Sequence, residues 1–213
     1  MSSQAVISTE MLILDVMRHG ETEMSHTLRG STDDALTQTG WQQMQQTLQH
    51  AMDAGRSWDV IFSSPLQRCQ HFAQSIATQL KLDLHCLPQL QEMHFGDWEG
   101  QSTQFLYETV PDQLEKFWLQ PTEFSPPNAE TLPQFDIRVS QAVERMMAYM
   151  QENGLKKALV ISHGGVIKLL KCKAQNLHLN DLLKMVADLG QLNHFCGTNA
   201  INLTLVHTKE SAL

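Results

Sequence analysis

The segment from residue 12 to residue 22 has the sequence LILDVMRHGET, in which a basic and polar cluster directly follows an apolar run. Residues 11–17 form a short run of apolar side chains, which is typical of a strand buried on both faces of a sheet. Arg18, His19 and Gly20 come where that strand should end. Ligands of open α/β sheets bind beyond the carboxyl ends of the strands. The segment therefore predicts a functional site at Arg18 and His19.

Apolar runs and helical patterns alternate along the rest of the chain. Further strands are predicted at 59–63, 82–87, 158–162 and 200–207. Helices are predicted from the cap Thr37 to Gly55, from Ser64-Pro65 to about residue 80, over 131–153, and after Gly164-Gly165. This alternation predicts an α/β fold with three α/β/α layers, a mainly parallel sheet and helices on both faces.

One stretch between the third predicted strand and the long helix has a different composition. Residues 95–124 contain seven of the fourteen aromatic residues, namely Phe95, Trp98, Phe105, Tyr107, Phe117, Trp118 and Phe124. Between 101 and 130 the only basic residue is Lys116. We expect one domain over 1–213, with a small helical cap inserted at about 101–130. Its aromatic side chains are explained equally well by a packed lid core and by a wall for the substrate.

Composition excludes several classes of protein. The 213 residues carry a formal net charge of −8, which disfavours bulk binding of nucleic acid or of anionic membranes. The four cysteines at 69, 86, 172 and 196 form no C-x-x-C pair, and no spacing typical of a metal site is present. The first basic residue is Arg18, and no apolar run approaches about 18 residues. We expect a cytoplasmic protein without a metal or cofactor, whose oligomeric state the sequence leaves open.

Two further strand ends carry polar groups of the same kind. Arg68 follows the second strand and His163 the fourth, and Gly164-Gly165 begins a helix whose free N–H groups favour an anion. Arg68 lies near the start of its helix, where side chains lean back toward the strand end. The two arginines, two histidines and helix N-terminus should converge on one crevice that binds a phosphoryl group.

Five blocks of sequence together resemble the histidine phosphatase superfamily, which includes the phosphoglycerate mutase-like proteins. The blocks are LILDVMRHGET (12–22), ALTQTGWQQM (35–44), IFSSPLQRCQHFA (61–73), LQEMHFGDWEG (90–100) and LVISHGGVIK (159–168). The resemblance covers most of the chain. It implies a phosphoglycerate mutase-like fold and a phosphoryl transfer in two steps that requires no metal.

The resemblance also implies roles for individual residues. His19 would be the nucleophile that becomes phosphohistidine, and Arg18, Arg68 and His163 would hold the phosphoryl oxygens. Glu92 would be the general acid, which first protonates the leaving oxygen and then activates water. The remaining positions implied to bind phosphate or substrate are Thr22, Ser25, Arg29 and Gly164.

Several alternatives stay open at this level. Glu99 or Asp97 is an alternative general acid, His163 is alternatively a residue that orients His19, and Arg68 alternatively forms a surface ion pair. The expected function is a phosphomonoesterase acting on a small molecule. The nearly cation-free cap suits a flat apolar leaving group better than a second phosphate. A phosphoglycerate mutase, a broad sugar phosphatase and a non-catalytic phosphate-binding protein are the alternatives.

Overall fold

The computed structural model describes residues 10–199 and 202–206, and within them six strands form one mixed sheet in the order β3-β2-β4-β1-β5-β6. The strands are β1 (Leu12–Arg18), β2 (Val60–Ser63), β3 (Leu84–Cys86), β4 (Lys157–Ser162), β5 (Leu192–Gly197) and β6 (Thr204–Leu205). Strands β3, β2, β4 and β1 are parallel, and β5 and β6 are antiparallel to their neighbours. The predicted α/β class with a mainly parallel sheet is confirmed.

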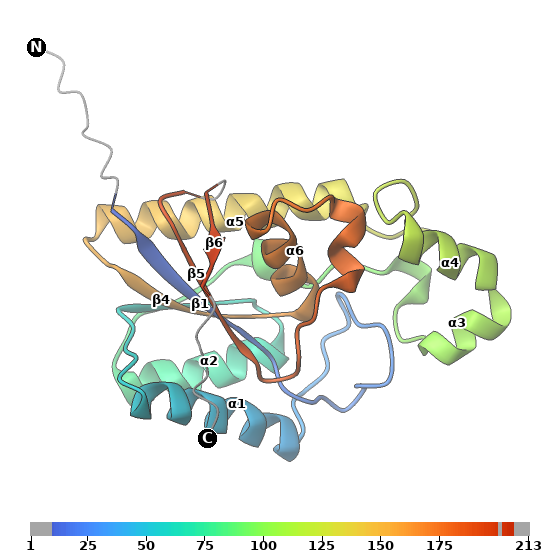
Figure 1. The fold of residues 1–213 in the computed structure, drawn as a ribbon. Helices are drawn as coiled ribbons and strands as arrows, with labels where there is room; N and C mark the ends of the chain where they lie inside the picture. The colour runs from blue at the N-terminus through green and yellow to red at the C-terminus, as the bar shows by residue number, and fades with distance from the viewer. Residues whose placement is uncertain (1–9, 200–201, 207–213) are drawn as a thin grey trace, which may run out of the picture.

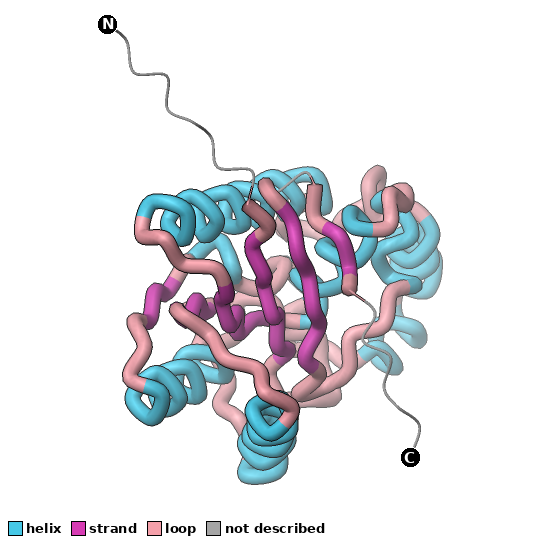
Figure 2. Tube along the Cα trace, turned by 60° about the vertical axis from the view of Figure 1, so that its left-hand side comes forward, coloured by secondary structure: helices cyan, strands magenta, loops and turns pink. Residues whose placement is uncertain are grey.

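Helices cover both faces of the sheet (Figures 1 and 2). They are α1 (Gln38–Asp53), α2 (Gln67–Leu80), α3 (Thr103–Thr109), α4 (Pro111–Leu119), α5 (Leu132–Glu152) and α6 (Gly164–Ala174), with short 3-10 turns η1 (Pro88–Leu90), η2 (Gly96–Trp98) and η3 (Leu179–Lys184). Helices α1 and α2 lie on one face, and α5 and α6 on the other. The three predicted layers are therefore present.

Alternation along the strands divides the apolar interior into two clusters. Val16 and Val160 pack in the cluster that contains α5 and α6, whereas Met17 and Ile161 pack in the cluster that contains α1 and α2. Successive side chains of a strand point to opposite faces, so each central strand supplies both layers. The central strands are consequently hydrophobic along most of their length, with Asp15 as a buried exception in β1, and this made them recognisable in the sequence.

The strands at the C-terminal end of the chain differ from the prediction. Strand β5 was not predicted, because its buried positions include Asn193 and Gly197 and no apolar run results. The strand predicted at 200–207 is only Thr204–Leu205 among the described residues, and residues 200, 201 and 207 lie outside them.

Helix α2 begins later than Ser64-Pro65 suggested. Its first residue is Gln67, and its N-cap Leu66 has no side-chain hydrogen bond. The carboxylate of Asp33 accepts from the Gln67 backbone N–H at 2.7 Å instead. A distant loop residue thus caps this helix, a contact that local sequence cannot indicate. The caps at Thr37 and Thr131 are confirmed.

Helices α3 and α4 stand at one end of the sheet, beyond the carboxyl end of β1 (Figure 1). They fall within the predicted cap segment. Phe117 of α4 packs edge-on against Trp98 and Phe95, with ring centroids 5.7 and 6.4 Å apart.

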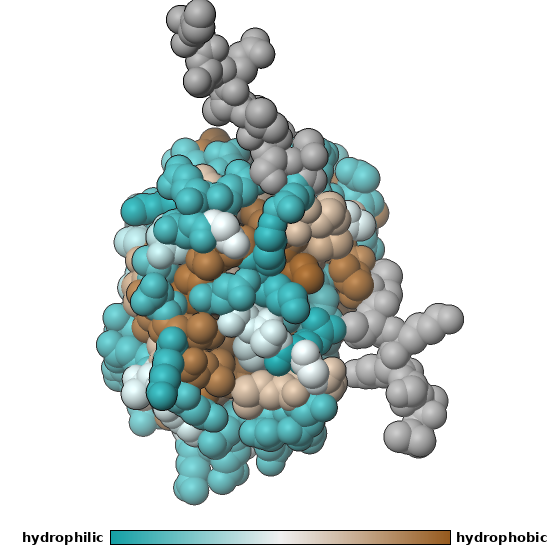
Figure 3. All heavy atoms as spheres, turned by 90° about the vertical axis from the view of Figure 1, so that its left-hand side faces the viewer, coloured by the Kyte–Doolittle hydropathy of each residue, from teal (hydrophilic) through white to brown (hydrophobic). Residues whose placement is uncertain are grey.

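At the opposite side of the molecule the surface is largely polar, with apolar atoms visible between the polar side chains (Figure 3). No helix among the described residues is long and apolar enough to cross a membrane.

Candidate active site

His19 lies at the carboxyl end of β1 with only 3% of its surface exposed. Its Nδ1 is 2.8 Å from the Gly20 carbonyl oxygen, to which it donates, so the other ring nitrogen, Nε2, keeps its lone pair. Burial lowers the pKa of His19 well below 6.5, and the positive charge of Arg68 adds to this effect. The imidazole is therefore neutral and has one nitrogen free to act as a nucleophile.

Close backbone contact holds the loop that follows His19. A side chain at Gly20 would lie 2.0 Å from the Gly40 carbonyl oxygen, and one at Gly40 would lie 1.9 Å from the Glu21 carbonyl oxygen. Only glycine permits such an approach, so the loop packs directly on the first turn of α1. The N-cap Thr37 adds a hydrogen bond of 2.8 Å to the Glu21 carboxylate.

Arg18 lies beside His19 with its guanidinium flat against the start of α6. A side chain at Gly164 would come within 3.2 Å of the Arg18 Cζ and Nε atoms. One Arg18 Nη donates to the Ala187 carbonyl, and the buried Nε has no hydrogen-bond partner among the described residues. The Arg18 side chain lines the cavity beside this helix start, while its enclosed Nε meets no acceptor in the described part of the chain.

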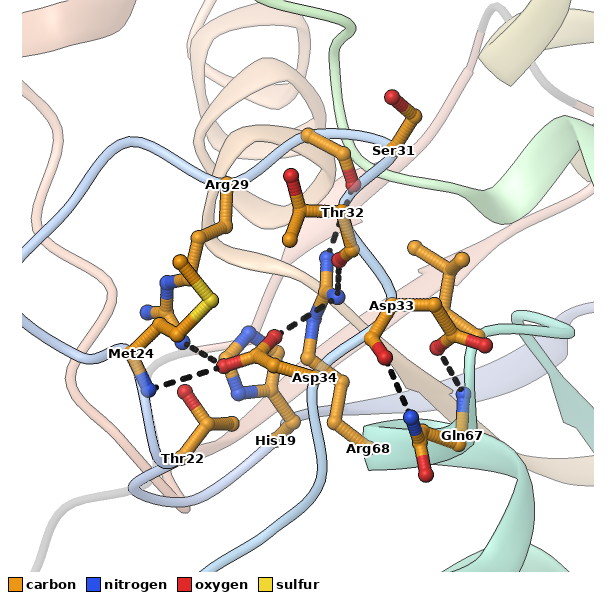
Figure 4. Close-up of polar contacts among 12 residues, drawn as sticks. His19, Thr22, Met24, Arg29, Ser31, Thr32, Asp33, Asp34, Gln67 and Arg68 are labelled. Carbon is orange, nitrogen blue, oxygen red and sulfur yellow. Dashed lines mark hydrogen bonds and ion pairs between the residues drawn. The ribbon is translucent and has the colours of Figure 1, made fainter. Parts of the chain in front are cut away.

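Arg68 is completely buried and connects three parts of the site (Figure 4). One Nη donates to the Thr32 carbonyl at 2.6 Å and lies 3.2 Å from the Asp34 carboxylate, and the other donates to the Gly30 carbonyl at 3.0 Å. Arg68 thus reaches back over the strand end as predicted. The alternative of a surface ion pair is wrong, because the side chain is inaccessible to solvent.

Asp34 is the shared counter-ion of two arginines. Its Oδ1 faces Arg68, and its Oδ2 lies 2.9 Å from Arg29 Nη1 and accepts from the Met24 backbone N–H at 3.3 Å. Asp34 is not recognisable as a site residue from the sequence, since an Asp-Asp pair before a helix resembles ordinary turn chemistry.

His163 has no exposed surface, and both of its ring nitrogens are engaged. Nδ1 accepts from Arg68 Nε at 3.3 Å, so Nε2 carries the proton and donates to Ser64 Oγ at 2.7 Å. Its ring centroid is 5.3 Å from that of His19, with the rings edge to face. In this arrangement His163 supports Arg68 through a hydrogen bond and His19 through packing. Direct contact of His163 and Arg68 with phosphate stays a prediction.

Glu92 approaches the site from the loop between η1 and η2. Its two carboxylate oxygens accept from the Met93 and Gly165 backbone N–H groups at 3.0 and 2.9 Å. A side chain at Gly165 would lie 2.2 Å from one of these oxygens. Because neither glycine has a side chain, the Arg18 guanidinium can approach Gly164 and the Glu92 carboxylate can approach Gly165.

The two alternative acids have other environments. Glu99 accepts from the backbone N–H groups of residues 30, 31, 32 and 95 and from the Thr32 hydroxyl. Burial opposes its charge, but these hydrogen bonds together hold the pKa of Glu99 below its usual value. Asp97 is exposed and accepts from the Asn128 amide at 3.0 Å. Among the described residues neither lines the cavity above His19.

Thr22 and Ser25 contact each other within the loop after β1. The Thr22 backbone N–H donates to Ser25 Oγ at 2.9 Å, and the two hydroxyl oxygens are 3.4 Å apart. Neither residue is among those that line the cavity. The structure therefore gives them a role in shaping the loop, and their binding of phosphate stays a prediction.

A cavity of about 530 Å³ opens above His19. Its polar floor contains Arg18, His19, Arg29, Glu92 and Gly164. The walls are largely apolar, and they include Phe95, Phe117, Trp118, Pro121, Leu132, Phe135, Leu182 and Leu183. Aromatic residues of the predicted cap thus serve both as lid core and as cavity wall. In the described part of the chain, no group of three or more His, Cys, Asp or Glu side chains is placed to hold a metal ion.

Residues 14–202 match the family model of the histidine phosphatase superfamily, branch 1. The chain belongs to this superfamily. The resemblance inferred from the five blocks is therefore confirmed.

Individual relatives agree with that assignment. The chain is 32% identical over 158 residues to the adenosylcobalamin/alpha-ribazole phosphatase of Escherichia coli K12, covering 73% of this chain and 75% of the relative. It is 25% identical over 177 residues to a 2,3-bisphosphoglycerate-dependent phosphoglycerate mutase of Bartonella henselae, covering 80% and 84%. The crystal structure of the alpha-ribazole phosphatase from Shigella flexneri superposes with a TM-score of 0.78 at 26% identity, covering 95% of this chain and 98% of that one.

Three residues of the site were not predicted from sequence. Besides Asp34, Lys168 of α6 lines the cavity, where burial lowers its pKa and the charge of Arg18 adds to this effect. Arg138 of α5 donates to carbonyl groups of the loop that carries Glu92. Lys168 lies one turn after Gly164-Gly165 on the same helix face, a spacing that offered a usable signal. Arg138 offered none, because it is 46 positions from Glu92.

The buried histidines should make stability depend on pH. The unfolded chain takes up protons below about pH 6.5, whereas folded His19 and His163, whose pKa values are lowered, do not. The free energy of unfolding should then be greatest above pH 6.5 and fall by about 1.4 kcal/mol per pH unit per histidine as the pH decreases. Urea unfolding of wild type and His19→Asn between pH 7.5 and 5 measures how much His19 contributes to the pH dependence of the free energy of unfolding. His26→Asn, at an exposed position, is the control, and equal slopes for all three proteins would refute the prediction.

Removing the charge of Asp34 should destabilise the fold. Asp34→Asn leaves the buried Arg29 and Arg68 without their counter-ion, so we expect a loss of about 3 kcal/mol in the free energy of unfolding. Asp181→Asn is the matched control, because its partner Lys184 is 74% exposed and such a pair contributes at most about 1 kcal/mol. Urea unfolding at pH 7.5 compares the two, and equal losses would contradict the role given to Asp34.

Proposed function

We propose that the protein is a metal-independent phosphomonoesterase that acts through a phosphohistidine intermediate on His19. One observation carries the proposal. A buried neutral imidazole, with Nδ1 bound to a backbone carbonyl and Nε2 free, lies on the cavity floor with Arg18 and Glu92. Membership of the histidine phosphatase superfamily supports a phosphatase.

In the first step, His19 Nε2 attacks phosphorus and the bond from phosphorus to the ester oxygen breaks. Glu92 supplies the proton that the departing oxygen needs, so an alcohol leaves and His19 carries the phosphoryl group. The Arg18 guanidinium and the Gly164 backbone at the start of α6 line the cavity, where they neutralise charge on the phosphoryl oxygens. Arg68 and Arg29, held by Asp34, add positive potential from beneath.

In the second step, water replaces the alcohol. Glu92, now a carboxylate, takes a proton from the water as its oxygen bonds to phosphorus and the bond from His19 to phosphorus breaks. Inorganic phosphate leaves, and Glu92 and His19 return to their starting states. The contact of the Glu92 carboxylate with Gly165 keeps it beside the helix start in both steps.

The apolar walls favour a flat and largely apolar leaving group. Phe95, Phe117 and Trp118 provide aromatic surface next to the polar floor. We therefore propose α-ribazole 5′-phosphate, a benzimidazole riboside phosphate, as the first substrate to test. Similarity to the E. coli adenosylcobalamin/alpha-ribazole phosphatase supports this choice, which would give the enzyme a role in cobalamin synthesis.

Phosphoglycerate mutase or sugar bisphosphatase activity is the second candidate. Lys168 and Lys184 reach the cavity from α6 and η3, outside the cap, and ammonium groups there suit a second anionic group on the substrate. The similarity to the Bartonella henselae mutase agrees with this alternative.

Replacing the nucleophile should abolish turnover. His19→Ala should lower kcat by at least about a thousandfold, because a covalent nucleophile acts as a unit with its partners. The measurement is phosphate release in the presence of excess chelator, together with detection of phosphohistidine in alkaline-quenched enzyme. His26→Ala, at an exposed position, is the control. Residual activity of His19→Ala near the wild-type level would rule out the proposed intermediate.

A panel of three substrates should separate the two candidates. The panel is α-ribazole 5′-phosphate, 3-phosphoglycerate and fructose 1,6-bisphosphate, measured by kcat/KM with chelator present. We expect a preference of about a hundredfold for α-ribazole 5′-phosphate, equivalent to about 2.7 kcal/mol of differential transition-state binding. Preference for the bisphosphate, or appearance of 2-phosphoglycerate from 3-phosphoglycerate before free phosphate, would favour the second candidate.

A further inference from the structure

Arg138 uses all of its N–H groups inside the protein. One Nη donates to the carbonyl oxygens of Gln89 and Gln91 at 2.9 and 2.8 Å. The other Nη donates to the Glu92 carbonyl at 2.8 Å and to the Glu130 carboxylate at 2.7 Å, and Nε donates to Glu130 at 2.6 Å. Five donors thus meet five acceptors, which are the two Glu130 carboxylate oxygens, the Gln89 carbonyl of η1 and the Gln91 and Glu92 carbonyls of the following loop.

Glu130 holds the same loop at a further point. Its backbone N–H donates to the His94 carbonyl at 3.0 Å, and the His94 N–H lies 3.4 Å from its carboxylate. The Arg138 and Glu130 side chains are only 22% and 15% exposed, so solvent screens the pair weakly. We call this pair, with its contacts to residues 89–94, the Arg138 clamp.

The clamp lies where no regular element fixes the backbone. Residues 91–95 connect η1 with η2 and belong to neither helix nor strand. The loop nevertheless has to present the Glu92 carboxylate to the leaving oxygen, and displacement of a catalytic group by about 1 Å can cost a factor of about a hundred in rate. A guanidinium fork that binds η1 at Gln89 and the loop at Gln91 and Glu92 meets this requirement, since its planar geometry leaves little freedom.

Arg138 has no direct path to the substrate. Among the described residues it is absent from the lining of the cavity above His19, although Glu92 and Phe135 line it. Its guanidinium lies 4.8 Å from the Phe135 ring centroid and lines a separate hollow with Gln91 and Glu92. Burial mainly lowers the pKa of His163, and the charges of Arg68 and Arg138 add to this effect. The hydrogen bonds of Arg138 reach the site only through the backbone around Glu92 and through Glu130.

We propose that Arg138, paired with Glu130, is a positioning residue that holds Glu92 in place to protonate the leaving group. The inference rests on the proposed function, because it takes Glu92 as the general acid. It goes beyond the proposed function by assigning the position of the acid to the ion pair between Arg138 of α5 and Glu130, which precedes that helix.

The experiment compares two substrates of nearly equal shape. Phenyl phosphate releases a basic phenolate that needs a proton, whereas 4-nitrophenyl phosphate releases a stable anion that does not. The variants are Arg138→Met and, as reference, Glu92→Gln. Arg145→Met is the matched control, since Arg145 lies exposed on the same helix. The readout is kcat/KM, which reports the step that breaks the ester bond.

Glu92→Gln tests the proposed function by itself. Loss of a general acid costs about 10²–10⁴ in rate, and this loss should fall on phenyl phosphate and largely spare 4-nitrophenyl phosphate. Equal losses on both substrates would show that Glu92 is not the acid, a failure of the proposed function that is separate from any result for Arg138.

Arg138→Met should reproduce the same pattern at smaller amplitude. We expect a loss of about tenfold or more on phenyl phosphate and less than about threefold on 4-nitrophenyl phosphate, with Arg138→Lys between it and wild type. Added to Glu92→Gln, Arg138→Met should change kcat/KM by less than about twofold, because the two residues act as one unit. Equal losses on both substrates, or additive losses in the double variant, would overturn the inference.

Thermal unfolding shows whether each variant is folded at the assay temperature. Where Arg138→Met does not fold, Glu130→Gln tests the same clamp, since it removes the charge and retains an acceptor oxygen. It should show the same selective loss on phenyl phosphate. The inference would also be overturned if the ratio of kcat/KM for phenyl phosphate to that for 4-nitrophenyl phosphate were the same in Glu130→Gln as in wild type.

Discussion

The structure around the site depends on the burial of one guanidinium. Arg68 is completely enclosed, and its donors connect the loop at residues 30–34, helix α2 and His163. A buried charge is tolerated only where its hydrogen bonds are satisfied and a counter-ion is near. Asp34 meets that condition, so the loop after β1 has to fold back against α2. Because Asp34 also binds Arg29, the same pairing places Arg29 on the cavity floor.

Burial of cations also explains how an acidic protein has a positively charged site. The chain carries a net charge of −8, yet Arg18, Arg29, Arg68 and Lys168 surround the position of the nucleophile. Charges in a poorly hydrated interior interact more strongly than charges separated by solvent, so local cations dominate the potential at His19. Burial lowers the pKa of His19, and the charges of Arg68, Arg18 and Arg29 add to this effect, so the imidazole stays neutral among them.

Glycine has a specific part in this arrangement. The helix start at Gly164-Gly165 is approached by the Arg18 guanidinium at one residue and by the Glu92 carboxylate at the next. A side chain at either position would occupy space that these groups use. The backbone N–H of Gly165 therefore binds the carboxylate directly, and the Arg18 guanidinium lies flat on the helix start.

The order of residues along the chain is enough to predict the α/β fold, the central strands and the place of Arg18, His19, Arg68 and His163 at strand ends. These features depend on local patterns, because apolar runs, caps and strand ends are properties of neighbouring residues. Tertiary structure alone decided the polar strand β5, the capping of α2 by Asp33, the pairing of Asp34 with two arginines and the clamp of Arg138 on the loop of Glu92. Each of these joins residues with no local pattern between them. The physical reason is that buried polar groups must find partners wherever the chain brings them, and the sequence does not mark those partners.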